Sequence, residues 1–94
     1  MAIRGFADER TEAVFRDRAP KGIPSAILSA ARRTLRMIDA AHRLDDLKLP
    51  AGNKLHPLER DRFGQHSIWI NSQFRICFRW TATGPDQVEI VDDH

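Results

Sequence analysis

The sequence predicts an α+β protein in which two N-terminal helices pack on one face of an antiparallel β-sheet. Apolar residues recur at helical spacing in the first half of the chain, and they alternate with polar residues in the second half. A loop rich in proline and glycine, residues 50–53, separates the two halves. Because only one face of the predicted sheet is apolar, the helices must cover that face. The polar face is expected to stay open and to carry the function.

The length and the charge of the chain narrow the class of protein. With 94 residues there is room for one hydrophobic core, so we expect a single domain over residues 1–94. The formal net charge is +2, and arginine supplies most of the positive charge, because Lys21, Lys48 and Lys54 are the only lysines. Arginine binds phosphate with paired hydrogen bonds, which favours a nucleic-acid partner. A solvated basic surface is the alternative.

Cysteine usage and hydropathy indicate the compartment. Cys77 is the only cysteine, which excludes an intrachain disulfide and a cysteine-rich metal site and fits a reducing environment. No apolar run approaches the roughly 18 residues of a membrane span, and the first residues show no apolar segment of a signal peptide. We therefore expect a cytoplasmic protein with no membrane partner.

Two helices are expected before residue 50. Asp8 is a suitable N-cap for a helix over residues 8–18, which Pro20 and Gly22 end. A second helix is expected over residues 24–41, because apolar residues recur along one of its faces: Ile27, Ala31, Leu35 and Ile38. Arginines occupy its opposite face, where solvation and contact with RNA or a partner protein both remain open.

The second half of the chain predicts four strands, over residues 54–58, 66–71, 74–80 and 87–91. The third is the clearest, because apolar and polar residues alternate along its whole length. Its apolar face consists of Phe74, Ile76, Phe78 and Trp80, and its polar face consists of Arg75, Cys77 and Arg79. We expect Cys77 to be packed and not to act as a nucleophile.

The polar face carries residue types suited to RNA cleavage. RNA can be cut without a metal, because its own 2′-hydroxyl can attack the adjacent phosphate. The reaction needs a base for that hydroxyl, an acid for the leaving oxygen and cations for the charge on the phosphate. His56, Arg75, Asp92 and His94 offer these groups. From the residues alone, a strand-end histidine, a surface arginine and a frayed polar terminus are the alternatives.

Four segments of the chain are similar to one known family. They are A-A-H-R-L-D-D-L-K-L-P, K-L-H-P-L-x-x-D-R-x-G-x-x-S-I-x-I, N-x-Q-F-R-I-C-F-x-W and V-E-I-V-D-D-H. Together they resemble the HigB-type toxins of the RelE superfamily, also called plasmid maintenance system killer proteins, over nearly the whole chain. The resemblance implies a RelE-like fold and a toxin that enters the ribosomal A site and cuts mRNA there, with no metal or other cofactor. It also implies an antitoxin partner of the helix-turn-helix, HigA-like type.

The resemblance further implies the site residues. The histidine of K-L-H-P-L is His56, the arginine of F-R-I-C-F is Arg75, and the family's terminal Asp-Tyr-His falls on Asp92, Asp93 and His94. We expect His56 and Asp92 to transfer protons, with His94 as the other acid/base candidate, and Arg75 to stabilise the phosphate. The expected RNA-binding residues are Lys54, Arg60, Arg62, Arg79 and Asp93.

Two departures from the family pattern favour an alternative. Asp93 stands where the family has tyrosine, and Glu59 and Arg60 stand where members often carry glycine or lysine. Both carboxylates oppose RNA. The alternative is an attenuated or inactive toxin that mainly binds its antitoxin and regulates its own operon. A generic RNA-binding domain is a third hypothesis, although the chain lacks the closely spaced aromatics of sheet-surface RNA binders.

Overall fold

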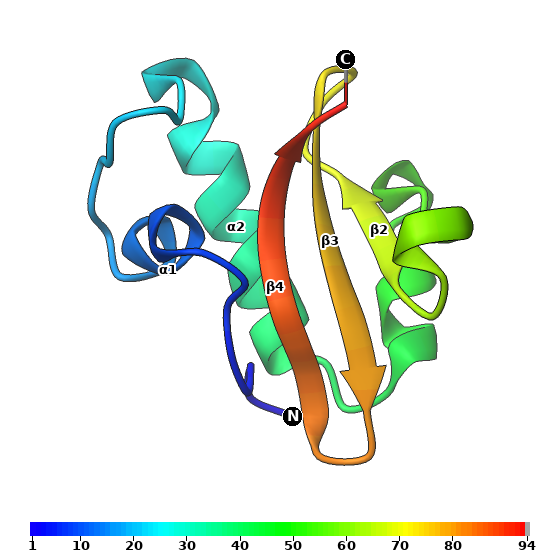
Figure 1. Ribbon diagram of the computed structural model, residues 1–94. Helices are drawn as coiled ribbons and strands as arrows, with labels where there is room; N and C mark the ends of the chain where they lie inside the picture. Colours follow the sequence, from blue (N-terminus) through cyan, green and yellow to red (C-terminus); the bar gives the residue numbers. More distant parts are fainter. Residues whose placement is uncertain (94) are drawn as a thin grey trace.

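The computed structural model describes residues 1–93, and within them the helices precede the sheet. The α-helices are α1 (Glu9–Phe15) and α2 (Leu28–Ala40), and the strands are β1 (His56–Pro57), β2 (His66–Trp69), β3 (Phe74–Thr81) and β4 (Gly84–Asp92). The strands form one antiparallel sheet in the order β1-β2-β3-β4. Figure 1 shows α1 and α2 on one side of this sheet. The predicted α+β architecture is confirmed.

Helix α1 is capped at its start and tied to the sheet. The Asp8 Oδ1 atom accepts a hydrogen bond from the Thr11 backbone N–H at 2.8 Å, as the N-cap prediction requires. The helix ends before the predicted residue 18, because Asp17 adopts a left-handed backbone with φ of 64°. The buried Thr11 Oγ1 accepts a hydrogen bond from the backbone N–H of Ile90 on β4 at 2.9 Å. This bond links α1 directly to the edge of the sheet.

Helix α2 supplies the helical half of the core. It is preceded by a 3-10 turn, η1 (Ser25–Ile27), and its apolar face is buried as predicted. From the strands, the core receives Ile68, Phe74, Ile76, Phe78, Val88 and Ile90. The helices therefore cover the apolar face of the sheet, and none of the helices in residues 1–93 is long and apolar enough to cross a membrane.

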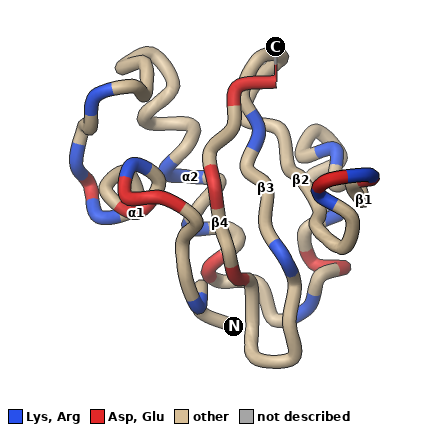
Figure 2. The backbone as a smooth tube through the Cα atoms, viewed as in Figure 1, with Lys and Arg blue, Asp and Glu red and all other residues tan. Residues whose placement is uncertain are grey.

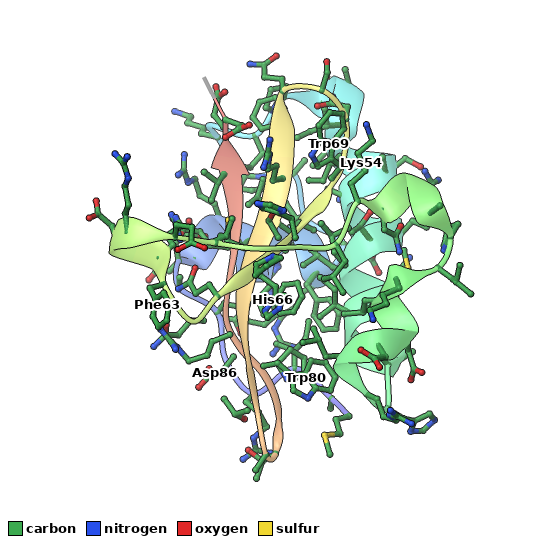
Figure 3. The ribbon with its side chains drawn as sticks, turned by 90° about the vertical axis from the view of Figure 1, so that its right-hand side faces the viewer. Lys54, Phe63, His66, Trp69, Trp80 and Asp86 are labelled. Carbon is green, nitrogen blue, oxygen red and sulfur yellow. The ribbon has the colours of Figure 1, made fainter. Side chains whose placement is uncertain are left out.

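The polar face of the sheet is less open than the sequence predicts. Strand β1 is reduced to two residues, and η4 (Arg60–Arg62) follows it within a segment, residues 58–65, that folds back over β3 and β4. Arg62 Nη2 lies 3.1 Å from Glu89 Oε1 on β4, and Figure 3 shows the chain before η4 crossing in front of β2 and β3. Beneath this segment Ser67 and Cys77, which pair across β2 and β3, are buried. Ser67 and Cys77 are therefore closed to a ligand, and we expect a site only on the part of the polar face that stays uncovered.

Candidate active site

A pocket of about 330 Å³ opens on the uncovered part of the polar face. It is lined by Lys54, Leu55, His56, Trp69 and Arg75. The structure thus brings together three residues that the sequence predicts for the site, His56, Arg75 and Lys54. Two cations and one acid/base group share one small cavity.

Each of these three side chains is positioned by a different element. Arg75 lies on β3, and His56 lies on β1, where it pairs with Ser67 of β2. Lys54 follows the 3-10 turn η3 (Ala51–Asn53) in a left-handed conformation with φ of 50°. The buried Asn53 side chain fixes this turn, because its amide donates to the carbonyl oxygens of Leu47 and Leu49 at 3.2 Å each.

Trp69 forms part of the pocket and was not among the predicted site residues. It is the cross-strand partner of Arg75, so both side chains leave the sheet on the same face. The Lys54 Nζ atom lies 4.0 Å from the centre of the indole ring, and the Arg75 Cζ atom lies 5.5 Å from it. Both distances are in the range of cation–π contacts. The signal in the sequence was an aromatic on the polar side of an alternating strand.

Asp93 contacts Arg75 directly. Arg75 Nη2 lies 2.7 Å from Asp93 Oδ2, and the two side chains are 26% and 43% exposed. The Asp93 backbone N–H donates to the Gln73 carbonyl at 2.7 Å, which continues the pairing of the two strands beyond β4. Figure 2 shows the acidic end of β4 beside a basic position on β3. The residue predicted to contact RNA is therefore placed against the predicted phosphate-binding arginine.

Asp92 lies on the other face of the sheet. It pairs with Phe74, whose side chain belongs to the core, and its Oδ2 accepts from Gln73 Nε2 at 3.3 Å. It also lines a second pocket together with Arg10 and Ile23, on the helix side. The structure does not bring Asp92 to His56 and Arg75, and His94 lies outside the described residues. Proton transfer by Asp92 and His94 stays a prediction.

The sequence matches known proteins over nearly its whole length. A family model described as the RelE-like toxin HigB of type II toxin–antitoxin systems matches residues 4–94. The chain belongs to the HigB-like toxin family. It is 38% identical over 81 residues to "Toxin HigB-1" of Vibrio cholerae, an alignment that covers 85% of this chain and 84% of that protein. It is 30% identical over 78 residues to "Endoribonuclease HigB" of Proteus vulgaris, with 83% and 84% covered. The resemblance in the sequence is confirmed.

Two of the other arginines predicted to bind RNA hold the segment 58–65 against the sheet. Arg62 pairs with Glu89, and Arg79 Nη2 donates to the Phe63 carbonyl at 3.5 Å. Arg60 is exposed and adopts a left-handed backbone with φ of 56°. Two of the three arginines predicted to bind RNA therefore have partners within the fold, and their contact with RNA stays a prediction.

Burial shapes the titration of two groups near the pocket. Burial raises the pKa of the Cys77 thiol, so the protonated form is favoured, as expected for a packed cysteine. Burial lowers the pKa of His66, and the neighbouring charge of His56 lowers it further. The His66 Nδ1 atom is buried without a hydrogen-bond partner in the described structure. The neutral form of His66 is thus favoured.

Among residues 1–93, no group of three histidine, cysteine or carboxylate side chains is arranged to hold a metal ion.

Proposed function

We propose that this HigB-like chain is a toxin that inhibits translation by cutting mRNA in the ribosomal A site. The observation that carries the proposal is the meeting of His56, Lys54 and Arg75 in one pocket, since an acid/base group and two cations are the groups that RNA cleavage needs. The name of the Proteus vulgaris relative, an endoribonuclease, supports the same reaction. The cut needs no metal in this proposal.

The proposed reaction is an internal transfer. The 2′-hydroxyl oxygen attacks the adjacent phosphorus and forms a new P–O bond, while the bond from phosphorus to the 5′ oxygen of the next nucleotide breaks. His56 accepts the proton of the 2′-hydroxyl, because histidine exchanges protons near neutral pH. The departing 5′ oxygen takes a proton from a second acid, the role predicted for His94, since Asp92 lies on the other face of the sheet.

Arg75 and Lys54 serve the phosphate in this proposal. Negative charge grows on the phosphate oxygens in the transition state, and a guanidinium can meet two of them with parallel hydrogen bonds. Lys54 adds a second positive charge beside the phosphate once its ammonium group has left the indole ring of Trp69. The Asp93 carboxylate forms an ion pair with the Arg75 guanidinium, so the substrate phosphate must displace this carboxylate to bind Arg75.

The substitution Arg75→Ala tests the proposal. We expect growth to return in cells poisoned by the wild type, and cleavage on programmed ribosomes to fall by about 100- to 1,000-fold, because one charge-stabilising donor is lost. Arg16→Ala is the control, because Arg16 is an exposed arginine at the C-terminal end of helix α1 that takes no part in the pocket. Unchanged toxicity of a stably folded Arg75→Ala protein would show that the pocket is not the active site.

Three further measurements test the finer parts of the proposal. Cleavage of the same mRNA on ribosomes and free in solution tests ribosome dependence, and chelation of divalent ions on preformed complexes tests metal independence. The proposed antitoxin partner, of the helix-turn-helix HigA-like type, should co-purify with the toxin when the two genes are expressed together. A partner of another fold would contradict that part alone.

A second candidate function rests on the Arg75–Asp93 pair. With the carboxylate 2.7 Å from the guanidinium, the chain has the arrangement expected of an attenuated toxin that mainly binds its antitoxin and regulates its operon. Controlled expression without antitoxin separates the two. Growth arrest with cleaved mRNA favours the enzyme, and the absence of both favours the regulator.

A further inference from the structure

We propose that Trp69 is the base-stacking residue of this site, receiving the base of the nucleotide whose phosphate Arg75 holds. The inference rests on the proposed function and adds to it a contact with the base. It assigns a role to a residue that neither the sequence motifs nor the comparisons single out.

The first supporting observation is that Trp69 does not serve the core. Among the described residues, the core and the side chains packed against it include Trp80 but not Trp69. Trp69 is half-buried and lines the pocket with His56 and Arg75. Figure 3 shows the two tryptophans at separate places, with Trp69 beside Lys54. A large aromatic ring is therefore presented to the pocket, where its face can meet a ligand.

The second observation is that Trp69 is held at a fixed place relative to Arg75. The two residues pair directly across β2 and β3, with neighbouring side chains on one face. The turn that joins these strands is tight, because Asn71 Oδ1 accepts from the backbone N–H groups of Gln73 and Phe74 at 2.8 and 2.7 Å. A phosphate on Arg75 would therefore leave its own base next to the indole.

The third observation concerns what covers the indole now. The Lys54 ammonium lies 4.0 Å from the ring centre. A cation–π contact at a partly exposed site is weak, whereas stacking of a base on an aromatic ring is stronger and tolerates any base. RNA can thus exchange Lys54 for a base on the ring, and the released ammonium can move to a phosphate.

An equilibrium binding experiment tests this inference. Trp80→Phe leaves Trp69 as the only tryptophan, so its fluorescence reports on the pocket. The probes are a 2′-O-methyl RNA trinucleotide, which cannot be cut, and an abasic strand with the same number of phosphates, both at low ionic strength. We expect the base-bearing strand to quench Trp69 and to bind more tightly than the abasic strand.

The substitution Trp69→Leu separates stacking from positioning. Because it removes the reporting tryptophan, binding is followed by a fluorescent label on the RNA. We expect affinity for the base-bearing strand to fall by about 5- to 100-fold, the range measured for loss of a base–aromatic stack. Affinity for the abasic strand should change little. Equal losses for both strands would overturn the proposal, because Trp69 would then act only by holding Lys54 and Arg75.

Two controls make the outcome decisive. Trp69→Phe keeps a smaller ring and should give an intermediate loss, with circular dichroism and thermal unfolding confirming the fold of each variant. Arg75→Ala should weaken both strands, so if it weakens neither while the base preference persists, the proposed function fails and the stacking role stands. A wild type that prefers neither strand, or binds neither measurably, would overturn the stacking role.

Discussion

The two faces of the β3–β4 pair have different tasks although the same two strands supply both. Ile76 and Phe78 point to the helices and are completely buried, whereas Arg75, one position away, points to the pocket and contacts Asp93. Neighbouring residues of a strand face opposite ways. Core residues and pocket-lining residues are therefore neighbours along the chain, and substitutions on one face should leave the other largely intact.

The polar face is itself divided. Near the middle of the strands the segment 58–65 covers Ser67 and Cys77, and nearer the β2–β3 turn the pocket stays open. The Arg62–Glu89 pair holds the covering segment against β4, and Arg79 binds the Phe63 carbonyl of the same segment. Part of the polar face of the sheet is therefore closed to solvent although charged residues surround it.

The strongest test of the division is Phe78→Ala. Phe78 is completely buried in the core, so the substitution leaves a cavity and should lower the free energy of unfolding by about 3–5 kcal/mol. Chemical denaturation measures this loss. Phe63→Ala is the control, because its side chain is 73% exposed and should change stability little. Similar losses for the two variants would contradict the assignment of the core.

A smaller effect is expected from Thr11→Val, which removes the acceptor for a backbone N–H of β4. The Ile90 N–H would then be buried without its partner, at a cost of about 1–3 kcal/mol in unfolding free energy. Thr34→Val is the matched control, since the Thr34 hydroxyl only donates to Ala30 within the same helix. Cleavage per folded molecule should stay unchanged, and a selective loss of cleavage would show that the two faces are coupled.

The polar face is tested by Asp93→Asn, which removes the negative charge that pairs with Arg75. We expect RNA binding and cleavage to rise by about two- to fivefold, the range of a partly exposed ion pair. Asp45→Asn, at another exposed ion pair, should change neither. Reduced cleavage in the Asp93 variant would instead show that this carboxylate takes part in the reaction.

The smallest expected effect is a change in the pH dependence of stability. Because burial lowers the pKa of His66, the unfolded chain binds a proton more readily than the folded one. The free energy of unfolding is therefore unaffected by His66 protonation above the ordinary pKa of 6.5, and it decreases as the pH falls below that value. His66→Gln should flatten the stability profile below about pH 6.5. Denaturation at several pH values measures the slope, and an unchanged slope would contradict this origin.

Local sequence patterns determined most of the fold. The alternation in β3 identified its core-facing and polar residues, the spacing in α2 identified its buried face, and Asp8 marked the start of α1. These properties depend on the period of a helix or a strand and on capping, which neighbouring residues define. The motifs K-L-H-P-L and F-R-I-C-F likewise predicted His56 and Arg75 as site residues, and both line the same pocket.

Only the tertiary structure decided how these residues meet. It placed Asp93 on Arg75 and Asp92 on the opposite face, brought Trp69 into the pocket, and folded residues 58–65 over Cys77. Each of these depends on strand register, on the irregularity between Cys77 and Arg79, or on contacts between distant segments. A shift of one residue in register moves a side chain to the other face of the sheet, and a single sequence leaves that register open until all strands have paired.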